Sequence, residues 1–203
     1  MKTQVSVLVL IAALAGSASA APQAFDFKDA KGVNNAQFKL DAPLEAITGH
    51  ANGISGTVTF DPAKPADTKG KIVVASQSLS VPNSMMKDHL HSEKWLDVAK
   101  HPEITFEAKE LKNVKTQGDV TTADAAGTFT LKGVSKDISI PVKLTYLKDK
   151  LSARLPSLKG DLLVVRSTFS IKRSDFNIQA GQSEDKVSDE IELTLAIAGA
   201  SAK

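Results

Sequence analysis

Apolar and polar residues alternate strictly in one segment of this chain after another. Between residues 137 and 146 every even position is apolar, and the odd positions hold Asp137, Ser139, Pro141, Lys143 and Thr145. Successive side chains of a β-strand point to opposite faces, so such a segment is predicted to be a strand with one apolar face. Similar alternation occurs near residues 35–40, 45–50, 57–60, 72–79, 104–108, 128–132, 169–171 and 191–197. The chain is therefore predicted to be all-β.

Turn residues separate these segments, for example at 61–65, 117–119 and 132–133. About eight antiparallel strands, each with one apolar face, either close as a barrel or stack as a sandwich, and the alternation leaves both open. Pro141 stands in mid-strand on the polar side, and proline donates no ladder hydrogen bond. Its strand is expected at an edge or a bulge, so a barrel would have a gap or a distorted seam.

One interval departs from the alternation. A short helical insert is predicted near residues 84–99, with Asn83 or Ser84 as its N-cap, because apolar residues there recur at roughly helical spacing. These apolar residues are Met85, Met86, Leu90, Trp95 and Leu96. They either complete the core at one end of the barrel or form a lid over a cavity mouth.

The first 20 residues have the pattern of an export signal. Lys2 is their only charge, an apolar stretch covers residues 5–15, and Ala18-Ser19-Ala20 forms an A-x-A cleavage pattern. We expect residues 1–20 to be removed and residues 21–203 to form a single domain. No later apolar run reaches the roughly 20 residues of a membrane-spanning helix, so stable membrane insertion is not expected. The chain has no cysteine, which excludes disulfides and thiolate chemistry, and the periplasm is the expected location.

The charge balance argues against nucleic-acid binding. Of the 25 basic residues one is Lys2, and 23 acidic residues oppose the rest without a long block of either sign. Binding to phosphates draws on a clustered positive surface, which this chain does not offer.

Four motifs in this order resemble the YceI-like family, and together they span nearly all of residues 21–203. They are T-G-H-A-N-G-I-S-G at 48–56, K-D-H-L-H-S-E-K-W at 87–95 with H-P-E-I-T-F at 101–106, G-T-F-T-L-K-G-V-S-K at 127–136, and R-S-D-F-N-I at 173–178 with V-S-D-E-I at 187–191. Lys87 stands where the family pattern has Arg, and Asn177 where it has Gly, a position that Asn tolerates. Residues 151–161 fit the pattern poorly.

The resemblance implies an exported, antiparallel lipocalin-like barrel that binds a long-chain molecule in its interior. The implied ligand is a polyisoprenoid, an isoprenoid quinone or a fatty-acid derivative, sequestered or carried without cofactor and without enzymatic chemistry. Whether the protein is a homodimer is left open. Apolar side chains on the inward faces would line the ligand cavity, or they would simply fill an eight-stranded barrel. They are Phe106, Phe129, Leu131, Ile140, Leu144, Phe169, Ile171 and Phe176.

Arg173 and Asp175 continue the inward parity of Phe169 and Ile171. In one interpretation the strand ends near Lys172 and the two residues cap the rim as an ion pair or a turn bond. In the other, Arg173 binds the polar head of the ligand through paired donors. The residues expected at the mouth or lid are accordingly Met85, Met86, Leu90, Trp95, Arg173 and Asp175.

Two other functions are compatible with parts of the sequence. A metal-assisted hydrolase would use His50, His89, His91 and His101, but His89 and His91 project about 200° apart on a helix and cannot chelate together. No metal ligand is therefore assigned, and no G-x-S-x-G motif indicates a serine nucleophile. A small outer-membrane barrel would show the same alternation with the apolar face outward, yet the chain has few aromatic residues for interfacial girdles.

Overall fold

The computed structural model describes residues 21–29 and 31–203, and its strands pair antiparallel in one continuous sheet. The expected export signal, residues 1–20, lies outside the described residues. The strands are β1 (Gln23–Asp26), β2 (Asn35–Asp41), β3 (Ala46–Ala51), β4 (Ile54–Phe60), β5 (Lys69–Ala75), β6 (Glu103–Gln117), β7 (Val120–Leu131), β8 (Val134–Leu147), β9 (Gly160–Lys172) and β10 (Glu190–Ala202). Two helices, α1 (Ser84–His91) and α2 (Leu151–Arg154), and three 3₁₀ turns, η1 (Pro65–Asp67), η2 (Ser76–Ser78) and η3 (Arg173–Phe176), complete the described elements.

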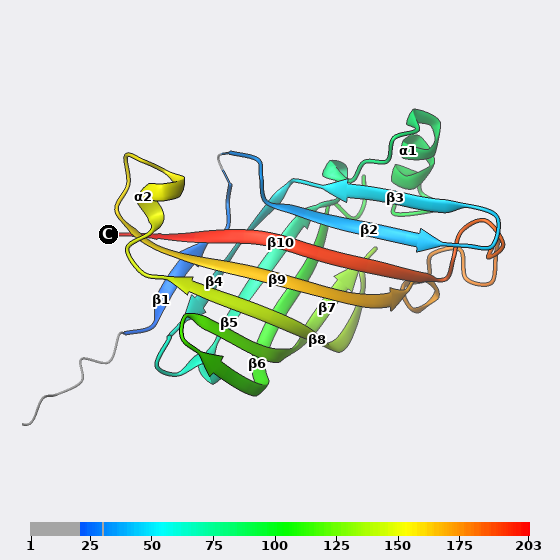
Figure 1. Ribbon diagram of the computed structural model, residues 1–203. Helices are drawn as coiled ribbons and strands as arrows, with labels where there is room; N and C mark the ends of the chain where they lie inside the picture. The colour runs from blue at the N-terminus through cyan, green and yellow to red at the C-terminus, as the bar shows by residue number, and fades with distance from the viewer. Residues whose placement is uncertain (1–20, 30) are drawn as a thin grey trace, which may run out of the picture.

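Eight of the described strands close into a barrel. Their order around the ring is β1-β4-β5-β6-β7-β8-β9-β10, and β1 returns to β10 through the pair Asp26↔Ala200. Further along the same edge of β10, residues Glu192–Ala196 pair with β2, which in turn pairs with β3 (Figure 1). The antiparallel barrel of about eight strands that the sequence predicts is confirmed.

The inward and outward faces follow the alternation in the sequence. In β8, Ile140, Val142 and Leu144 are buried, whereas Pro141 and Lys143 are exposed. A one-residue shift in register would turn every apolar side chain of the strand to water, so burial determines the pairing. The apolar core therefore lies inside the barrel and the charged side chains lie outside.

The wall of the barrel has a seam beside Pro141. β8 pairs with β7 from Val134 to Thr145, but with β9 only from Lys143↔Arg166 to Leu147↔Leu162. Pro141 has no N–H to continue the ladder, and its carbonyl accepts a hydrogen bond from the Ser167 hydroxyl at 2.6 Å instead. The later part of β9 pairs with β10 alone among the described strands. The seam agrees with the expectation from the position of Pro141.

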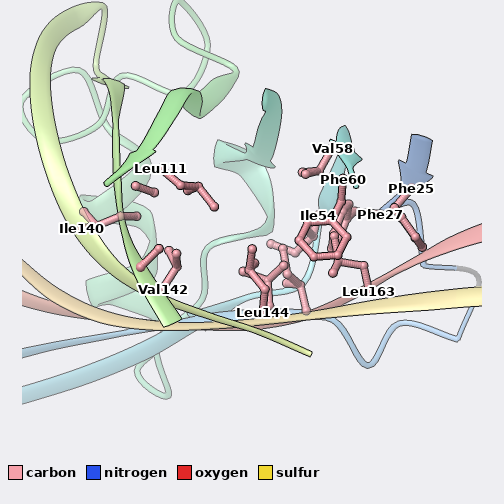
Figure 2. Close-up of a cluster of buried hydrophobic side chains, with 14 residues drawn as sticks. Phe25, Phe27, Ile54, Val58, Phe60, Leu111, Ile140, Val142, Leu144 and Leu163 are labelled. Carbon is pink, nitrogen blue, oxygen red and sulfur yellow. The ribbon is translucent and has the colours of Figure 1, made fainter. Parts of the chain in front are cut away.

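One end of the barrel is plugged by aromatic side chains. Phe25 and Phe27 are completely buried and Phe60 nearly so. The Phe25 ring packs edge-to-face on Tyr146, with centroids 6.3 Å apart. Figure 2 shows Phe25, Phe27 and Phe60 gathered beside Leu163. The short strand β1, which the sequence analysis missed, thus closes both the ring and this end.

Buried polar groups tie the loops over the plug. The carboxylate of Asp161 is fully buried and accepts hydrogen bonds from the Tyr146 hydroxyl at 2.9 Å, the Asp149 N–H at 2.8 Å and the Lys203 ammonium at 2.9 Å. Burial alone would raise the pKa of Asp161, but these three donors together hold it below its ordinary value. A second tie is the ion pair between Arg154 of α2 and Asp29, at 3.0 Å.

The helical insert lies at the opposite end, next to the connection between β9 and β10 (Figure 1). The side chain of Asn83 accepts a hydrogen bond from the Met86 N–H at 3.0 Å, so Asn83 is the N-cap. The α-helix ends at His91, and residues 92–100 form turns in which Asp97 has a left-handed backbone. The insert is therefore confirmed, with a shorter helix than the apolar spacing over residues 84–99 suggests. Within the described part of the chain, no helix is long and apolar enough to cross a membrane.

Candidate functional site

A cavity of about 430 Å³ occupies the barrel between the aromatic plug and α1. Its wall comes from the inward faces of the strands, from Leu144 and Val165 near the plug to Leu90 and Trp95 at the other end. The volume falls within the 300–1,000 Å³ typical of small-molecule sites. Because the surface of the cavity is almost entirely apolar, the cavity favours an apolar occupant.

Seven of the eight expected cavity residues line this space, namely Phe106, Phe129, Leu131, Ile140, Leu144, Phe169 and Ile171. Phe176 does not line it. It is buried behind Phe129, with the two ring centroids 5.5 Å apart in an edge-to-face arrangement. Phe129 packs in the same way on Phe169 at 6.2 Å. Phe176 therefore supports the wall from behind, because η3 turns the chain out of the strand before residue 176.

Some of the residues expected at the mouth line the cavity, and others do not. Met86 and Leu90 of α1, four residues apart on one helix face, line the cavity together with Trp95. Met85 is 68 % exposed and does not line it, because it lies on the other side of α1. Asp175 is likewise exposed and lies outside the lining.

Arg173 is completely buried, and its guanidinium bonds only to backbone carbonyls. Nε donates to the carbonyl of Ser188 at 3.2 Å, and the two Nη atoms donate to four carbonyls of the loop between η3 and β10. These acceptors are Ile178 at 2.9 Å, Gln179, Gln182 at 2.6 Å and Val187 at 3.1 Å. An arginine has five N–H donors, so every one is used. The guanidinium also lies over the Trp95 ring, 5.9 Å from its centroid.

Arg173 and Asp175 are not brought together. β9 ends at Lys172, and η3 then breaks the strand parity that placed both residues on one face. Asn177 ends η3 in the left-handed conformation, as the substitution of Asn for Gly allows. The carboxylate that organises this turn is Asp189, which accepts from the Ser174 N–H at 2.9 Å and from its hydroxyl at 2.8 Å. Asp189 lies within the fourth motif, but it is not among the residues predicted at the mouth.

The four histidines are dispersed. His89 lines the cavity mouth, whereas the His91 ring bonds through Nε2 to the Leu79 carbonyl at 2.8 Å. His50 pairs with Ser80 through the backbone, and His101 packs so tightly on Gly133 that a Cβ there would lie 2.7 Å from its ring. Among the described residues, no three His, Cys, Asp or Glu side chains form a group that could hold a metal ion. The hydrolase alternative gains no support.

Several lining residues were missed from the sequence. Phe38, Leu40 and Ile47 of the β2–β3 hairpin line the cavity, and the alternation in residues 35–40 already points to the first two. Glu45 and Lys186 lie at the rim. Nothing in their local sequence distinguishes them from other exposed charges.

The fold and the cavity together define the class: this is a lipocalin-like antiparallel barrel protein with an apolar cavity in its interior. The chain belongs to the YceI-like family, since the model of the YceI-like domain matches residues 25–198.

Relatives of known sequence cover most of the chain. A UPF0312 protein of Pseudomonas aeruginosa is 31% identical over 153 residues, which is 75% of this chain and 73% of the relative. A UPF0312 protein of Yersinia pestis is 31% identical over 157 residues, covering 77% and 75%.

Solved structures show the same fold. The Campylobacter jejuni YCEI protein superposes with a TM-score of 0.61 at 25% identity, covering 76% of this chain and 85% of that one. Burkholderia cenocepacia BcnA superposes with a TM-score of 0.64 at 21% identity, covering 81% and 94%. A domain of Saccharophagus degradans described as polyisoprenoid-binding gives 0.64 at 12% identity, covering 89% and 99%.

The outward face of the strands carries charge. Glu107 and Lys109 of β6, and Asp137 and Lys143 of β8, are exposed on the outer wall. A barrel embedded in lipid has an apolar outer band. The outer-membrane alternative therefore gains no support from the structure or from the relatives.

Proposed function

We propose that this protein binds one long-chain apolar or amphiphilic molecule inside its barrel, with the tail toward the aromatic plug and the polar end toward α1. The observation that carries the proposal is the cavity itself, apolar along its length and blocked at one end by Phe25, Phe27 and Phe60. The shared fold of the Saccharophagus degradans domain described as polyisoprenoid-binding supports a polyisoprenoid among the ligands, beside isoprenoid quinones and fatty-acid derivatives.

The energetics of such binding are favourable. Burial of apolar surface contributes about 25 cal/mol per Å², so a chain that buries roughly 200 Å² gains about 5 kcal/mol before the costs of ordering. The ligand is held without covalent chemistry and without a cofactor.

We further propose that the mature protein, a single domain of residues 21–203, lies in the periplasm. Removal of residues 1–20 after the Ala18-Ser19-Ala20 pattern leaves a chain that begins Ala-Pro-Gln-Ala-Phe. N-terminal sequencing of the exported protein checks this, and a membrane-retained chain that starts at Met1 would contradict it.

The binding test uses the sole tryptophan of the chain as its reporter. Trp95 lines the cavity, so a bound chain changes its fluorescence without any label. We expect saturable binding of prenyl alcohols, and we expect organic extraction of the purified protein followed by mass spectrometry to recover a long-chain lipid.

A matched pair of variants locates the site. Ala125 lies inward on β7 and lines the cavity, whereas its neighbour Ala126 faces outward. Ala125→Phe fills the cavity and should weaken prenyl alcohol binding at least tenfold, while Ala126→Phe should bind as the wild type does. Equal binding by wild type and both variants would show that the ligand lies elsewhere.

A further inference from the structure

The charged groups that line the cavity are found at the α1 end alone. Among the described residues, the lining includes three formally charged side chains, Glu45, Arg173 and Lys186. Glu45 follows the turn from β2 to β3, and Lys186 belongs to the loop that precedes β10. A hydrogen bond of 2.9 Å from the Leu44 N–H to the Asp185 carbonyl joins these two segments. Figure 1 shows the turn and the loop side by side.

Arg173 cannot serve as a receptor for an anion. Its five N–H donors are all engaged by the carbonyls of Ile178, Gln179, Gln182, Val187 and Ser188. An incoming phosphate or carboxylate would have to break these bonds and leave buried carbonyls without donors, which is unfavourable. The most strongly cationic group of the lining is thereby removed from ligand recognition.

The Lys186 ammonium at the rim has more carboxylates than other ammonium groups beside it. Lys186 stands beside Glu184 and Asp185, and Glu45 faces the mouth from the neighbouring turn. All four side chains are exposed. On this side of the mouth, three carboxylates against one ammonium make the field unfavourable for an anion within the Debye length of about 10 Å at 0.1 M salt.

Other charges at this end are of both signs and lie outside the lining. Lys39 is paired with Asp41 on β2 at 2.7 Å, and α1 carries Lys87 and Asp88. Lys94 and Lys132 lie together at the turn after α1, where the Lys132 ammonium donates to the Lys94 carbonyl at 3.4 Å. Uncharged hydrogen-bonding groups are present at the rim, for example the Ser183 hydroxyl, and the His89 imidazole lines the mouth as well.

We infer that the mouth selects long-chain ligands with an uncharged, hydrogen-bonding head, such as a hydroxyl, a quinone carbonyl or an amide, and disfavours the corresponding phosphates and carboxylates. This inference rests on the proposed binding of a long chain in the barrel. The specificity-determining residue is Glu45, supported by Glu184 and Asp185 of the facing loop.

The experiment compares two probes with one tail, farnesol and farnesyl phosphate, by titration of Trp95 fluorescence at low salt. The wild type should bind farnesol at least tenfold more tightly, and the preference should shrink as salt is added. Equal affinity, or tighter binding of the phosphate, would overturn the inference and leave the proposed function standing. Binding of neither probe would overturn the proposed function itself, so the two failures are distinguishable.

A pair of charge reversals assigns the preference to the rim. Glu45→Lys should shift the ratio of the two dissociation constants about tenfold toward the phosphate. Glu107→Lys makes the same change on the outer wall of β6 and should leave the ratio unchanged. If the ratio moves equally in both variants, or in neither, the selectivity does not come from Glu45 and the assignment is wrong.

Discussion

A buried guanidinium is stable only when each of its N–H groups finds an acceptor, and Arg173 finds all of them on the backbone of one loop. That loop also bonds to the turn after α1, through the Gln179 side chain and the Lys94 carbonyl at 3.1 Å. Arg173 therefore acts as a structural clamp at the mouth, a role that strand parity alone does not reveal.

Arg173→Met should lower the free energy of unfolding by about 3–5 kcal/mol, because it removes a buried charge that several carbonyls depend on. The loss should be the same with a prenyl alcohol or without it. Thermal unfolding of both forms measures this. Arg173→Lys should not restore the loss, because an ammonium lacks the planar fork of five donors.

Arg166→Met serves as the control, because the Arg166 side chain is exposed and Nη1 alone donates, to the Val165 carbonyl at 3.1 Å and the Ile197 carbonyl at 3.2 Å. It should cost about 1 kcal/mol or less. If Arg173→Met kept wild-type stability but lost affinity for phosphorylated ligands alone, Arg173 would be a head-group ligand after all.

The pH dependence of stability is a second expectation at the residue scale. The pKa of Asp161 is held below its ordinary value of about 3.9, despite burial, by its three hydrogen-bond donors. A depressed folded-state pKa contributes stability that is present above about pH 4 and is lost as the pH falls through the folded value. Asp161→Asn should therefore cost about 2 kcal/mol at pH 7, and the difference from wild type should narrow below pH 4.

Chemical denaturation at a series of pH values from 7 down to 3 measures this difference. Asp119→Asn, which changes an exposed carboxylate in the β6–β7 turn, is the matched control and should follow the wild type. A cost of Asp161→Asn that stays constant over the whole series would mean that the charge of Asp161 contributes nothing.

At the scale of elements, the helices at the two ends of the barrel are anchored differently. None of the eight residues of α1 is buried, whereas α2 at the plugged end anchors itself with the fully buried Leu151. An isolated helix of the length of α1 is marginal in water, so the N-cap and the cavity-facing Met86 and Leu90 carry much of its stability.

Asn83→Ala should remove the N-cap bond and cost α1 about 1 kcal/mol of local stability. Amide exchange in residues 84–91 should become several-fold faster, while the global midpoint of thermal unfolding stays nearly unchanged. Hydrogen exchange read by mass spectrometry resolves this segment. A fall in the global midpoint as large as the local effect would show that α1 unfolds together with the barrel.

The elements that the sequence predicts are those with a long repeating signal. β8 and β10 alternate over many residues. Pro141 predicts the seam, because a residue without an N–H cannot donate a ladder hydrogen bond in any sheet. β1 has four residues and α2 has four, too few for a period to be recognised. Rim contacts such as Leu44 to Asp185 join segments far apart in the chain, so no local pattern reports them.

At the scale of the whole molecule, one end of the barrel is filled by side chains and the other end holds the cavity. Phe25, Phe27 and Phe60 fill the first end (Figure 2). None of these three rings lines the cavity, which extends from there toward α1. Stability and binding are thus concentrated at opposite ends, and substitutions in the plug should affect unfolding before they affect ligand affinity.

Phe27→Ala should lower the free energy of unfolding by about 3–5 kcal/mol, because it leaves a cavity among rings that cannot collapse to fill it. Val33→Ala, six residues further on at an exposed position, should cost less than about 0.5 kcal/mol. Urea denaturation compares the two. Similar small costs for both would mean that the plug is not part of the cooperative core.

β1 pairs with β10 through residues 26 and 200, so the ring closes only when the first and the last strand of the barrel pair. β10 alone holds β9, β2 and β1 together. A polypeptide that emerges from a ribosome or a translocation channel with its amino end first therefore has no sealed interior until its final segment is free. A premature stop codon before residue 190 would therefore not yield a smaller barrel. It would yield an open sheet with an exposed apolar face and unpaired strand edges, which quality-control proteases recognise.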